Sequence, residues 1–364
     1  MVLIILKRLT LALIPLLLLH MMPAAHAQMG ISTSARSCVL MHEDGNVIYE
    51  KNADDRNLIA STTKIMTAIV CLENSDISDV VRIKSEHCAI EGSSMYLKAG
   101  ERYTVKELLL GLMLASGNDA ALAIADHVSG GSMEFAALMN EKAKELGMNN
   151  SSFANPHGLD DKTHYSSARD MAKLMFYCME NENFKDLVSC HSADIKGQTY
   201  TNHNKLLISY PGCIGGKTGF TSAAGRCLVT CCERNGIRLV CVTLADADDW
   251  QDHMSLYDYA YANYNVWSLS QEVSYQVPLI SGNREKVSLV PKEELKLFLK
   301  KNEKVEIKAD YPPFIFAPVK IGETAGEICV IIKNKVVAQT PLVYEQNAVM
   351  AYPCLNRAAS KGAI

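Results

Sequence analysis

Ser61 and Lys64 stand three residues apart in Ser61-Thr62-Thr63-Lys64, where an apolar stretch predicts a helix over residues 60–72. Residues three apart on a helix share a face, so this spacing places the Lys64 amine beside the Ser61 hydroxyl. A serine hydroxyl is a weak nucleophile without a nearby base, and a buried lysine with a lowered pKa can be that base. The spacing therefore indicates a serine nucleophile, although S-x-x-K standing alone is more typical of a solvated helix start.

A second polar triplet, Ser116-Gly117-Asn118, lies between two apolar stretches that predict helices. The Ser116 hydroxyl could relay a proton, and the Asn118 amide could bind a peptide group. The alternative is a glycine that ends one helix and an asparagine that caps the next. The same pattern at residues 281–283 has no flanking helices and predicts a turn. The triplet alone is therefore weak.

A third motif, Lys217-Thr218-Gly219, follows two glycines and precedes Phe220 at the start of a predicted strand. Lys217 would supply positive charge and Thr218 a hydroxyl. Gly219 would leave room for a ligand to approach the backbone, although the surrounding glycines could equally mark a bulge.

In order and spacing, the three motifs resemble the S-x-x-K, S-x-N and K-T-G set of penicillin-binding proteins and class A β-lactamases. The resemblance covers roughly residues 37–264 and is closest to the low-molecular-mass, serine-type D-alanyl-D-alanine carboxypeptidases of peptidase type S11. The β-rich remainder resembles the second domain of that family. The segments that carry the resemblance beyond the triplets are residues 59–67, 91–97, 155–160, 210–213 and 217–244.

The resemblance implies a two-step acyl transfer without metal or cofactor. Ser61, deprotonated by Lys64, would attack the carbonyl between the two D-alanines that end a peptidoglycan stem peptide. The backbone N–H groups of Ser61 and Phe220 would form the oxyanion hole. Water would then release the acyl-enzyme, and β-lactams would acylate Ser61 as covalent inhibitors.

The same resemblance implies roles for the other motif residues. Ser116 and Lys217 would deliver a proton to the leaving D-alanine, and Asn118 would orient the peptide. Lys217 and Thr218 would attract the terminal carboxylate. His157 matches a His-Gly pair near the cleft of the family, although a structural loop histidine is an equal alternative.

The chain departs from the best-known members at their carboxylate-facing arginines. One of those positions corresponds to His203 here, and another falls within the acidic residues 248–251. We hypothesise that Arg226 supplies the missing positive charge.

Three rival functions remain open. A transpeptidase would use the same residues with an amine in place of water. A class A-like β-lactamase would need a deacylating glutamate, and residues 155–160 contain none. A non-catalytic wall-binding module would tolerate loss of Ser61 or Lys64, yet both are present. The chain has no G-x-S-x-G of an α/β-hydrolase and no H-E-x-x-H of a zinc peptidase.

The elements that must position these motifs are helices and short strands. Thr104 and Glu107 form a capping-box pattern at the start of one predicted helix. Asp44-Gly45-Asn46 and Asn235-Gly236 predict hairpin turns in residues 36–49 and 226–245. This mixture predicts an α/β (α+β) fold, an antiparallel sheet flanked by helices as in β-lactamases and transpeptidases. Further helices are expected over residues 104–114, 119–127, 135–146 and 168–179.

From about residue 272, short alternating stretches predict a small C-terminal β-sandwich domain. With the boundary near Ser268, the expected division is a signal peptide (1–27), a catalytic domain (28–268), the β-sandwich (269–346) and a short tail (347–364). One short helix is expected around residues 292–300. Strands are expected at residues 273–279, 286–290, 305–308, 317–321, 328–332 and 335–341.

The N-terminus has the pattern of a secretory signal peptide. Lys7 and Arg8 precede an apolar run over residues 11–19, and Ala25-His26-Ala27 fits a cleavage site. The run is too short for a membrane span, which needs roughly 20 apolar residues. We therefore expect an exported enzyme that is secreted or cell wall-associated.

The mature chain after residue 27 carries 34 Lys and Arg against 40 Asp and Glu, a net charge of −6. This balance gives no basic stripe for a nucleic acid. The twelve cysteines lie mostly in apolar runs and form no C-x-x-C pair, so mostly free, buried thiols are expected. The tail contains Pro353 and lacks the apolar stripe of an amphipathic anchor helix, which leaves membrane association open.

Overall fold

A computed structural model describes residues 31–351 of the chain. Contacts divide the chain into Met1–Thr33 and Ser34–Ile364, and the fold below is that of the second unit. The predicted signal peptide and residues 352–364 of the predicted tail lie outside the described residues.

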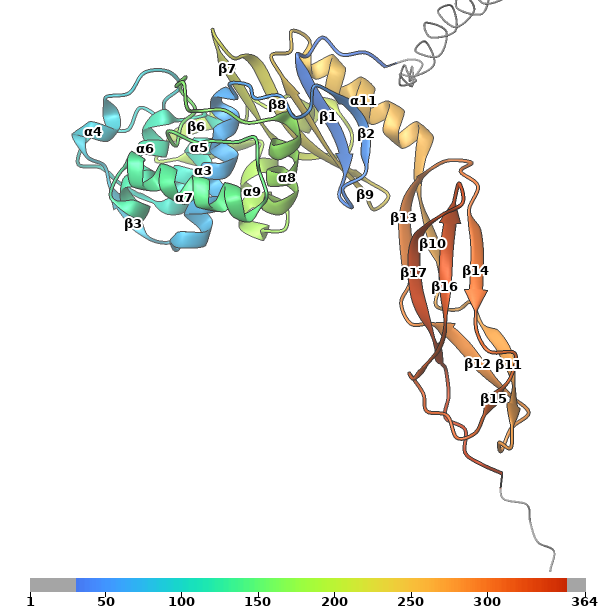
Figure 1. The fold of residues 1–364 in the computed structure, drawn as a ribbon. Coiled ribbons are helices and arrows are strands. Elements are labelled where there is room, and N and C mark those ends of the chain that lie inside the picture. Colours follow the sequence, from blue (N-terminus) through green and yellow to red (C-terminus); the bar gives the residue numbers. More distant parts are fainter. Residues whose placement is uncertain (1–30, 352–364) are drawn as a thin grey trace, which may run out of the picture. The chain divides into compact units, whose positions relative to one another are not determined.

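A five-stranded antiparallel sheet organises the first part of this unit, in the order β2-β1-β9-β8-β7 (Figure 1). Both predicted hairpins are confirmed, and Asn235 and Gly236 have the positive φ angles that a type I′ turn requires. The last strand in the order, β7, forms an edge of the sheet. The strands are β1 (Ser37–His42), β2 (Val47–Lys51), β7 (Cys213–Thr221), β8 (Gly225–Arg234) and β9 (Ile237–Leu244).

The two faces of this sheet are covered by different helices because side chains alternate along each strand. Val229 and Val242 face a large apolar core to which α8 (Ala168–Cys178) contributes. The neighbouring Thr230 points to the opposite face, where its Oγ1 lies 2.7 Å from the Nδ1 of His253 on α11 (Asp249–Asn263). α11 was not predicted, because it packs on the sheet through polar and aromatic side chains instead of an apolar stripe.

The helices expected over residues 104–114, 119–127, 135–146 and 168–179 are present, whereas those at Ser85–Cys88, Glu182–Ser189 and Leu206–Ser209 were not predicted. Thr104 Oγ1 accepts from Glu107 N (3.1 Å) and the Glu107 carboxylate accepts from Thr104 N (2.7 Å), so the predicted capping box is present. The predicted helix over residues 60–72 begins as a 3-10 turn. These elements are η2 (Ala60–Thr63), α3 (Lys64–Asn74), α4 (Ser85–Cys88), α5 (Val105–Leu114), α6 (Asn118–Ser129), α7 (Ser132–Glu145), α9 (Glu182–Ser189) and α10 (Leu206–Ser209). Two short hairpins accompany them, β3 (Val80–Arg82) with β4 (Arg102–Thr104) and β5 (Ser192–Ile195) with β6 (Gln198–Thr201).

The C-terminal part is all-β, as the fold-class prediction requires. It has its own apolar core and contains a six-stranded sheet of order β14-β16-β17-β12-β11-β15 and a β10-β13 pair. The expected boundary at Ser268 falls inside β10. The strands are β10 (Tyr264–Leu269), β11 (Tyr275–Ile280), β12 (Lys286–Pro291), β13 (Leu295–Lys300), β14 (Glu306–Asp310), β15 (Ile315–Phe316), β16 (Thr324–Ile332) and β17 (Lys335–Tyr344).

Two local predictions in this part are wrong. Residues 292–300 form no helix: Leu295–Lys300 is β13, whose alternating residues pair with β10, and Phe298 stacks on Tyr264 with 5.1 Å between the ring centroids. The strand expected at residues 317–321 is displaced to Ile315–Phe316, since Pro318 has no N–H to donate to a ladder.

All eleven cysteines within the described residues are free, and seven of them are buried. The buried thiols lie on the strands and helices around the central sheet. They are Cys38, Cys71, Cys178, Cys227, Cys231, Cys232 and Cys241.

Candidate active site

Ser61 lies on the 3-10 turn η2, immediately before Lys64 begins α3. Two threonine hydroxyls hold this turn: Thr62 Oγ1 donates to Ile59 O (2.6 Å) and Thr63 Oγ1 donates to Ala60 O (2.8 Å). The turn leaves the Ser61 side chain partly exposed while Lys64 is fully buried. Ser61 Oγ is therefore open to a ligand on one side and to the lysine on the other.

Lys64 Nζ makes three close contacts: it lies 3.0 Å from Ser61 Oγ, 2.7 Å from Asn118 Oδ1 and 2.7 Å from the His157 carbonyl oxygen. Burial, and then the charge of Lys217, lower the pKa of Lys64 well below its ordinary value. A neutral amine has two N–H bonds and one lone pair. Two of the contacts are carbonyl acceptors, so a neutral Lys64 amine that donates to both would direct its lone pair at the Ser61 hydroxyl. This arrangement is that of a base.

Ser116 and Asn118 flank Gly117 between α5 and α6 and both are buried. Asn118 Nδ2 donates to Glu91 O (2.7 Å), and its backbone N–H donates to Ser93 O (2.7 Å). The amide thus links Lys64 to the loop of residues 91–97, with one N–H still available for a ligand. Ser116 Oγ has no hydrogen-bond partner within residues 31–351, although it is buried.

The third motif lies on the edge strand β7 beside the serine turn. A Cβ on Gly219 would stand 3.0 Å from Ile59 O and 3.0 Å from Ser61 N, so any larger residue would press on the turn. Lys217 is buried, donates from Nζ to Thr218 O (3.0 Å), and has its pKa lowered by desolvation to about 7. Phe220 is exposed. Three separate elements therefore bring Ser61, Ser116 and Lys217 to one place.

A cavity of about 570 Å³ opens at this place. Four of the predicted site residues are not part of its lining: Lys64, Asn118, His157 and Lys217. The lining consists of Ser61, Ser93, Ser116, Asn202, His203, Lys205, Thr218, Gly219, Phe220, Arg226, Asp249 and Trp250.

Arg226 lines the cavity, but an acidic neighbour occupies its guanidinium. Arg226 Nη2 donates to both carboxylate oxygens of Asp249, at 2.6 and 2.8 Å, and the guanidinium stands 5.5 Å over the Trp250 ring centroid. Asp249 therefore compensates the charge that we expected Arg226 to offer.

His157 contacts Lys64 through its backbone carbonyl, while its ring Nδ1 accepts from Leu159 N (3.2 Å). Burial, with a smaller effect of Lys64, lowers the pKa of His157 to about 3, so its ring is neutral. The loop of residues 155–160 thus supplies a carbonyl to Lys64 instead of a titrating side chain.

Two positioning residues were missed. Asp119 accepts from Ser94 Oγ (2.6 Å), Met95 N (2.9 Å) and Leu97 N (3.0 Å), which fixes the loop that Asn118 also holds. One signal for Asp119 was available in the sequence, its place directly after Asn118, but an acid in the first turn of a helix is common for other reasons.

The other missed residue is His164, which is buried under the serine turn. Its Nδ1 accepts from Ala154 N (3.1 Å), so Nε2 carries the proton and faces Thr63 Oγ1 at 2.7 Å. Burial lowers the pKa of His164 to about 4. A lone histidine gives no sequence signal for such a contact.

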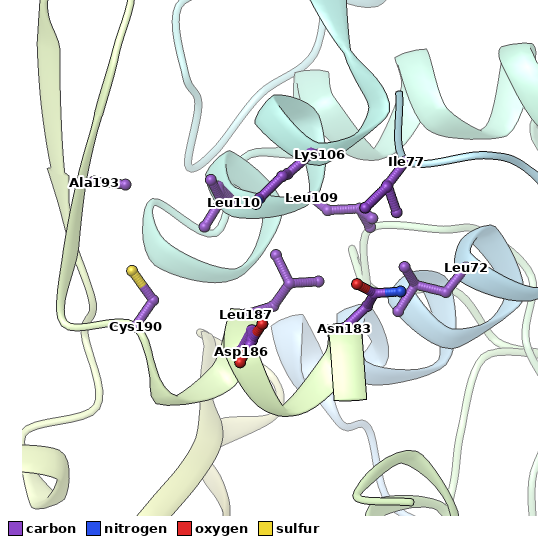
Figure 2. Close-up of a pocket in the computed structure, with 10 residues that line it drawn as sticks. All are labelled: Leu72, Ile77, Lys106, Leu109, Leu110, Asn183, Asp186, Leu187, Cys190 and Ala193. Carbon is purple, nitrogen blue, oxygen red and sulfur yellow. The ribbon is translucent and has the colours of Figure 1, made fainter. Parts of the chain in front are cut away.

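A second cavity, of about 250 Å³, lies elsewhere in the helical part (Figure 2). Figure 2 shows leucine side chains of α3, α5 and α9 around it, with Cys190 at one end. Every predicted site residue lies outside this lining, and its walls are mostly aliphatic. Among residues 31–351, no cluster of three His, Cys, Asp or Glu side chains could hold a metal ion.

Comparison with known proteins agrees with this geometry. Residues 22–248 match the family Peptidase_S11, D-alanyl-D-alanine carboxypeptidase, and residues 261–349 match the penicillin-binding protein 5, C-terminal domain family. The chain is 34% identical to D-alanyl-D-alanine carboxypeptidase DacF of Bacillus subtilis over 92% of each chain. It is 31% identical to D-alanyl-D-alanine carboxypeptidase DacC of Escherichia coli, over 87% of this chain and 84% of that one.

A solved structure of penicillin binding protein 5 from Haemophilus influenzae superposes with a TM-score of 0.71 at 26% identity, covering 88% of this chain and 99% of that one. The likeness extends over both the mixed sheet-and-helix part and the all-β part. The chain therefore belongs to the D-alanyl-D-alanine carboxypeptidase family of serine peptidases.

Proposed function

We propose that the protein removes the terminal D-alanine from peptidoglycan stem peptides through an acyl intermediate on Ser61. The observation that carries this proposal is the fully buried Lys64 amine, whose Nζ lies 3.0 Å from Ser61 Oγ and 2.7 Å from each of two carbonyl oxygens. A serine beside such a base is an activated nucleophile.

In the first step, Ser61 Oγ forms a bond to the carbonyl carbon between the two D-alanines, and its proton passes to Lys64 Nζ. The C–N bond then breaks, and the leaving D-alanine nitrogen takes a proton through Ser116 and Lys217. Two features support this route. Ser116 Oγ is buried without a partner in the described chain, and the pKa of Lys217, about 7, lets it hold or release a proton near neutrality.

The negative charge of the tetrahedral intermediate would be bound by the backbone N–H groups of Ser61 and Phe220. Gly219 precedes Phe220 and lies against the serine turn, where a Cβ added to it would stand 3.0 Å from Ser61 N. One such donor contributes about 3 kcal/mol to transition-state stabilisation. Asn118 and Thr218 would orient the peptide. In the second step, water attacks the Ser61 ester and releases the shortened peptide.

We further propose that the enzyme acts outside the cytoplasm, where its peptidoglycan substrate lies, after cleavage of the signal peptide at residue 27. Within residues 31–351, each helix is too short or too polar to span a membrane. β-Lactams, which resemble the reacting peptide, would acylate the same serine.

Intact-mass analysis with a penicillin tests the proposal. The wild type is compared with Ser61→Ala and with Ser222→Ala, which removes an exposed serine from the turn after β7. An adduct of one penicillin is expected on the wild type and on Ser222→Ala, with none on Ser61→Ala. The same three proteins are then assayed for release of D-alanine from a peptide that ends in D-Ala-D-Ala.

Absence of both an adduct and penicillin hydrolysis in the wild type would overturn the proposal and favour a wall-binding module. An adduct together with D-alanine release that continues only when an acceptor amine is added would show that an amine, and not water, is the acceptor.

A further inference from the structure

The substrate of the proposed reaction ends in a carboxylate, and this inference rests on that proposal. A site that prefers a free C-terminus needs a positive charge beside the leaving D-alanine. Four side chains could supply it: those of His203, Lys205 and Arg226, which line the 570 Å³ cavity, and that of Lys217, which donates to the backbone of the lining residue Thr218. The surroundings of each side chain determine how available its charge is to a substrate carboxylate.

Arg226 is the least available of the four. Its Nη2 already donates to both oxygens of Asp249, which is itself buried and lines the same cavity. A carboxylate arriving at Arg226 would meet the negative charge of Asp249 at hydrogen-bond range from the same guanidinium. The pair therefore presents little net charge to a ligand.

Lys217 and His203 carry only a partial charge at neutral pH. Burial lowers the pKa of Lys217 to about 7, and the proposed reaction uses its proton. Partial desolvation, and then the charge of Lys217, lower the pKa of His203 below its ordinary value. Neither residue is a permanent cation.

Lys205 differs from all three. Its side chain is exposed and lines the cavity, and its ammonium forms no ion pair with any acid within residues 31–351. Its backbone is well fixed, because Lys205 O accepts from Ser209 N (3.0 Å) and the preceding Asn204 caps Leu206 N through Oδ1 (3.1 Å). The four-carbon stem thus extends from a rigid base into the cavity.

We propose that Lys205 is the specificity-determining cation that receives the C-terminal carboxylate of the substrate, together with the Thr218 hydroxyl. The ion pair of Arg226 and Asp249 then forms a part of the cavity wall that has no net charge. A lysine in this role holds the carboxylate as a mobile point charge, whereas an arginine fork would fix its plane.

The test compares two substrates: an N-acetylated peptide ending in D-Ala-D-Ala, and the same peptide with a C-terminal amide. The readout is the ratio of kcat/KM for the acid to kcat/KM for the amide. The variants are Lys205→Gln, Lys205→Arg and Arg226→Gln. Lys144→Gln, which removes an exposed lysine of α7, is the matched control.

In Lys205→Gln the ratio is expected to fall about tenfold, as for loss of one charge-assisted hydrogen bond, mainly through a higher KM for the acid. Lys205→Arg keeps the charge and should retain most of the ratio. Lys144→Gln should match the wild type.

An unchanged ratio in Lys205→Gln would overturn the proposal, and a fall in Arg226→Gln alone would assign the carboxylate to Arg226. Failure of the proposed function itself looks different, because the wild type would then release no D-alanine from the acid.

Discussion

Gly158 offers a sharp test of how the serine turn is held. It adopts a φ of +89°, and its N–H donates to Asn155 Oδ1 (2.7 Å). A Cβ added here would stand 2.0 Å from Ala60 O and 2.8 Å from Thr63 Oγ1. The nearest atom is backbone, so either the loop of Gly158 or the turn of Ser61 must move by about an ångström.

The magnitude of the effect follows from two costs. A left-handed backbone costs a residue with a Cβ about 1–2 kcal/mol, and overpacking adds about 1–3 kcal/mol. Gly158→Ala should therefore lower the free energy of unfolding by about 2–5 kcal/mol. Gly197→Ala is the matched control, because Gly197 has a φ of +81° and no atom within 4 Å of its added Cβ. Its expected cost is about 1–2 kcal/mol.

The rate of acylation should also differ between Gly158→Ala and Gly197→Ala. The carbonyl of His157, next to Gly158, lies 2.7 Å from Lys64 Nζ, so movement of the loop displaces an acceptor that orients the base. A displacement of about 1 Å can cost up to about 100-fold in rate. Urea denaturation and the second-order rate of acylation by a fluorescent penicillin measure the two effects. Equal destabilisation of both variants, or unchanged acylation in Gly158→Ala, would refute the reasoning.

Three further predictions concern residues around the site. Lys217 is protonated in the unfolded chain but loses its proton above about pH 7 when the protein is folded. The free energy of unfolding of the wild type, relative to that of Lys217→Met, should therefore rise by up to about 1.4 kcal/mol per pH unit from pH 7.5 to 9. If urea denaturation shows that the free energy of unfolding changes equally with pH in both proteins, the prediction is contradicted. Asp119→Asn should destabilise the protein by about 3 kcal/mol, because an amide replaces a carboxylate that accepts from Met95 N and Leu97 N. The variant should also be acylated more slowly. A melting temperature equal to that of the wild type would contradict this prediction. Thr104→Ala removes the capping box of α5 and should cost about 1 kcal/mol while acylation keeps its wild-type rate, so slower acylation would show that α5 carries more than a structural role.

The parts of the site that are local in sequence could be predicted. Ser61 and Lys64 share one helical turn, so their spacing alone places Nζ near Oγ. Asn118 is 54 residues from Lys64, and its Oδ1 lies 2.7 Å from Nζ. Only resemblance to a family could suggest that contact.

The parts that depend on distant packing could not be predicted. His164 reaches Thr63 across 101 residues, and no pattern around it marks that contact. α11 lacks an apolar stripe because it buries polar side chains such as His253 against the sheet. The helix expected over residues 292–300 is wrong because residues 295–300 alternate as a strand does and pair with β10.

The burial of the free cysteines controls how fast their thiols can be alkylated or oxidised. Burial raises the pKa of Cys71 and of Cys227 to about 11, and raises that of Cys178 well above its ordinary value. Because only the thiolate reacts, these groups are inert while they are enclosed. Alkylation therefore has to wait for transient local opening, and its rate reports how often α3, α8 or β8 opens. The buried thiols are thus built-in exchange probes, and the rate at which they oxidise depends on how often those openings occur.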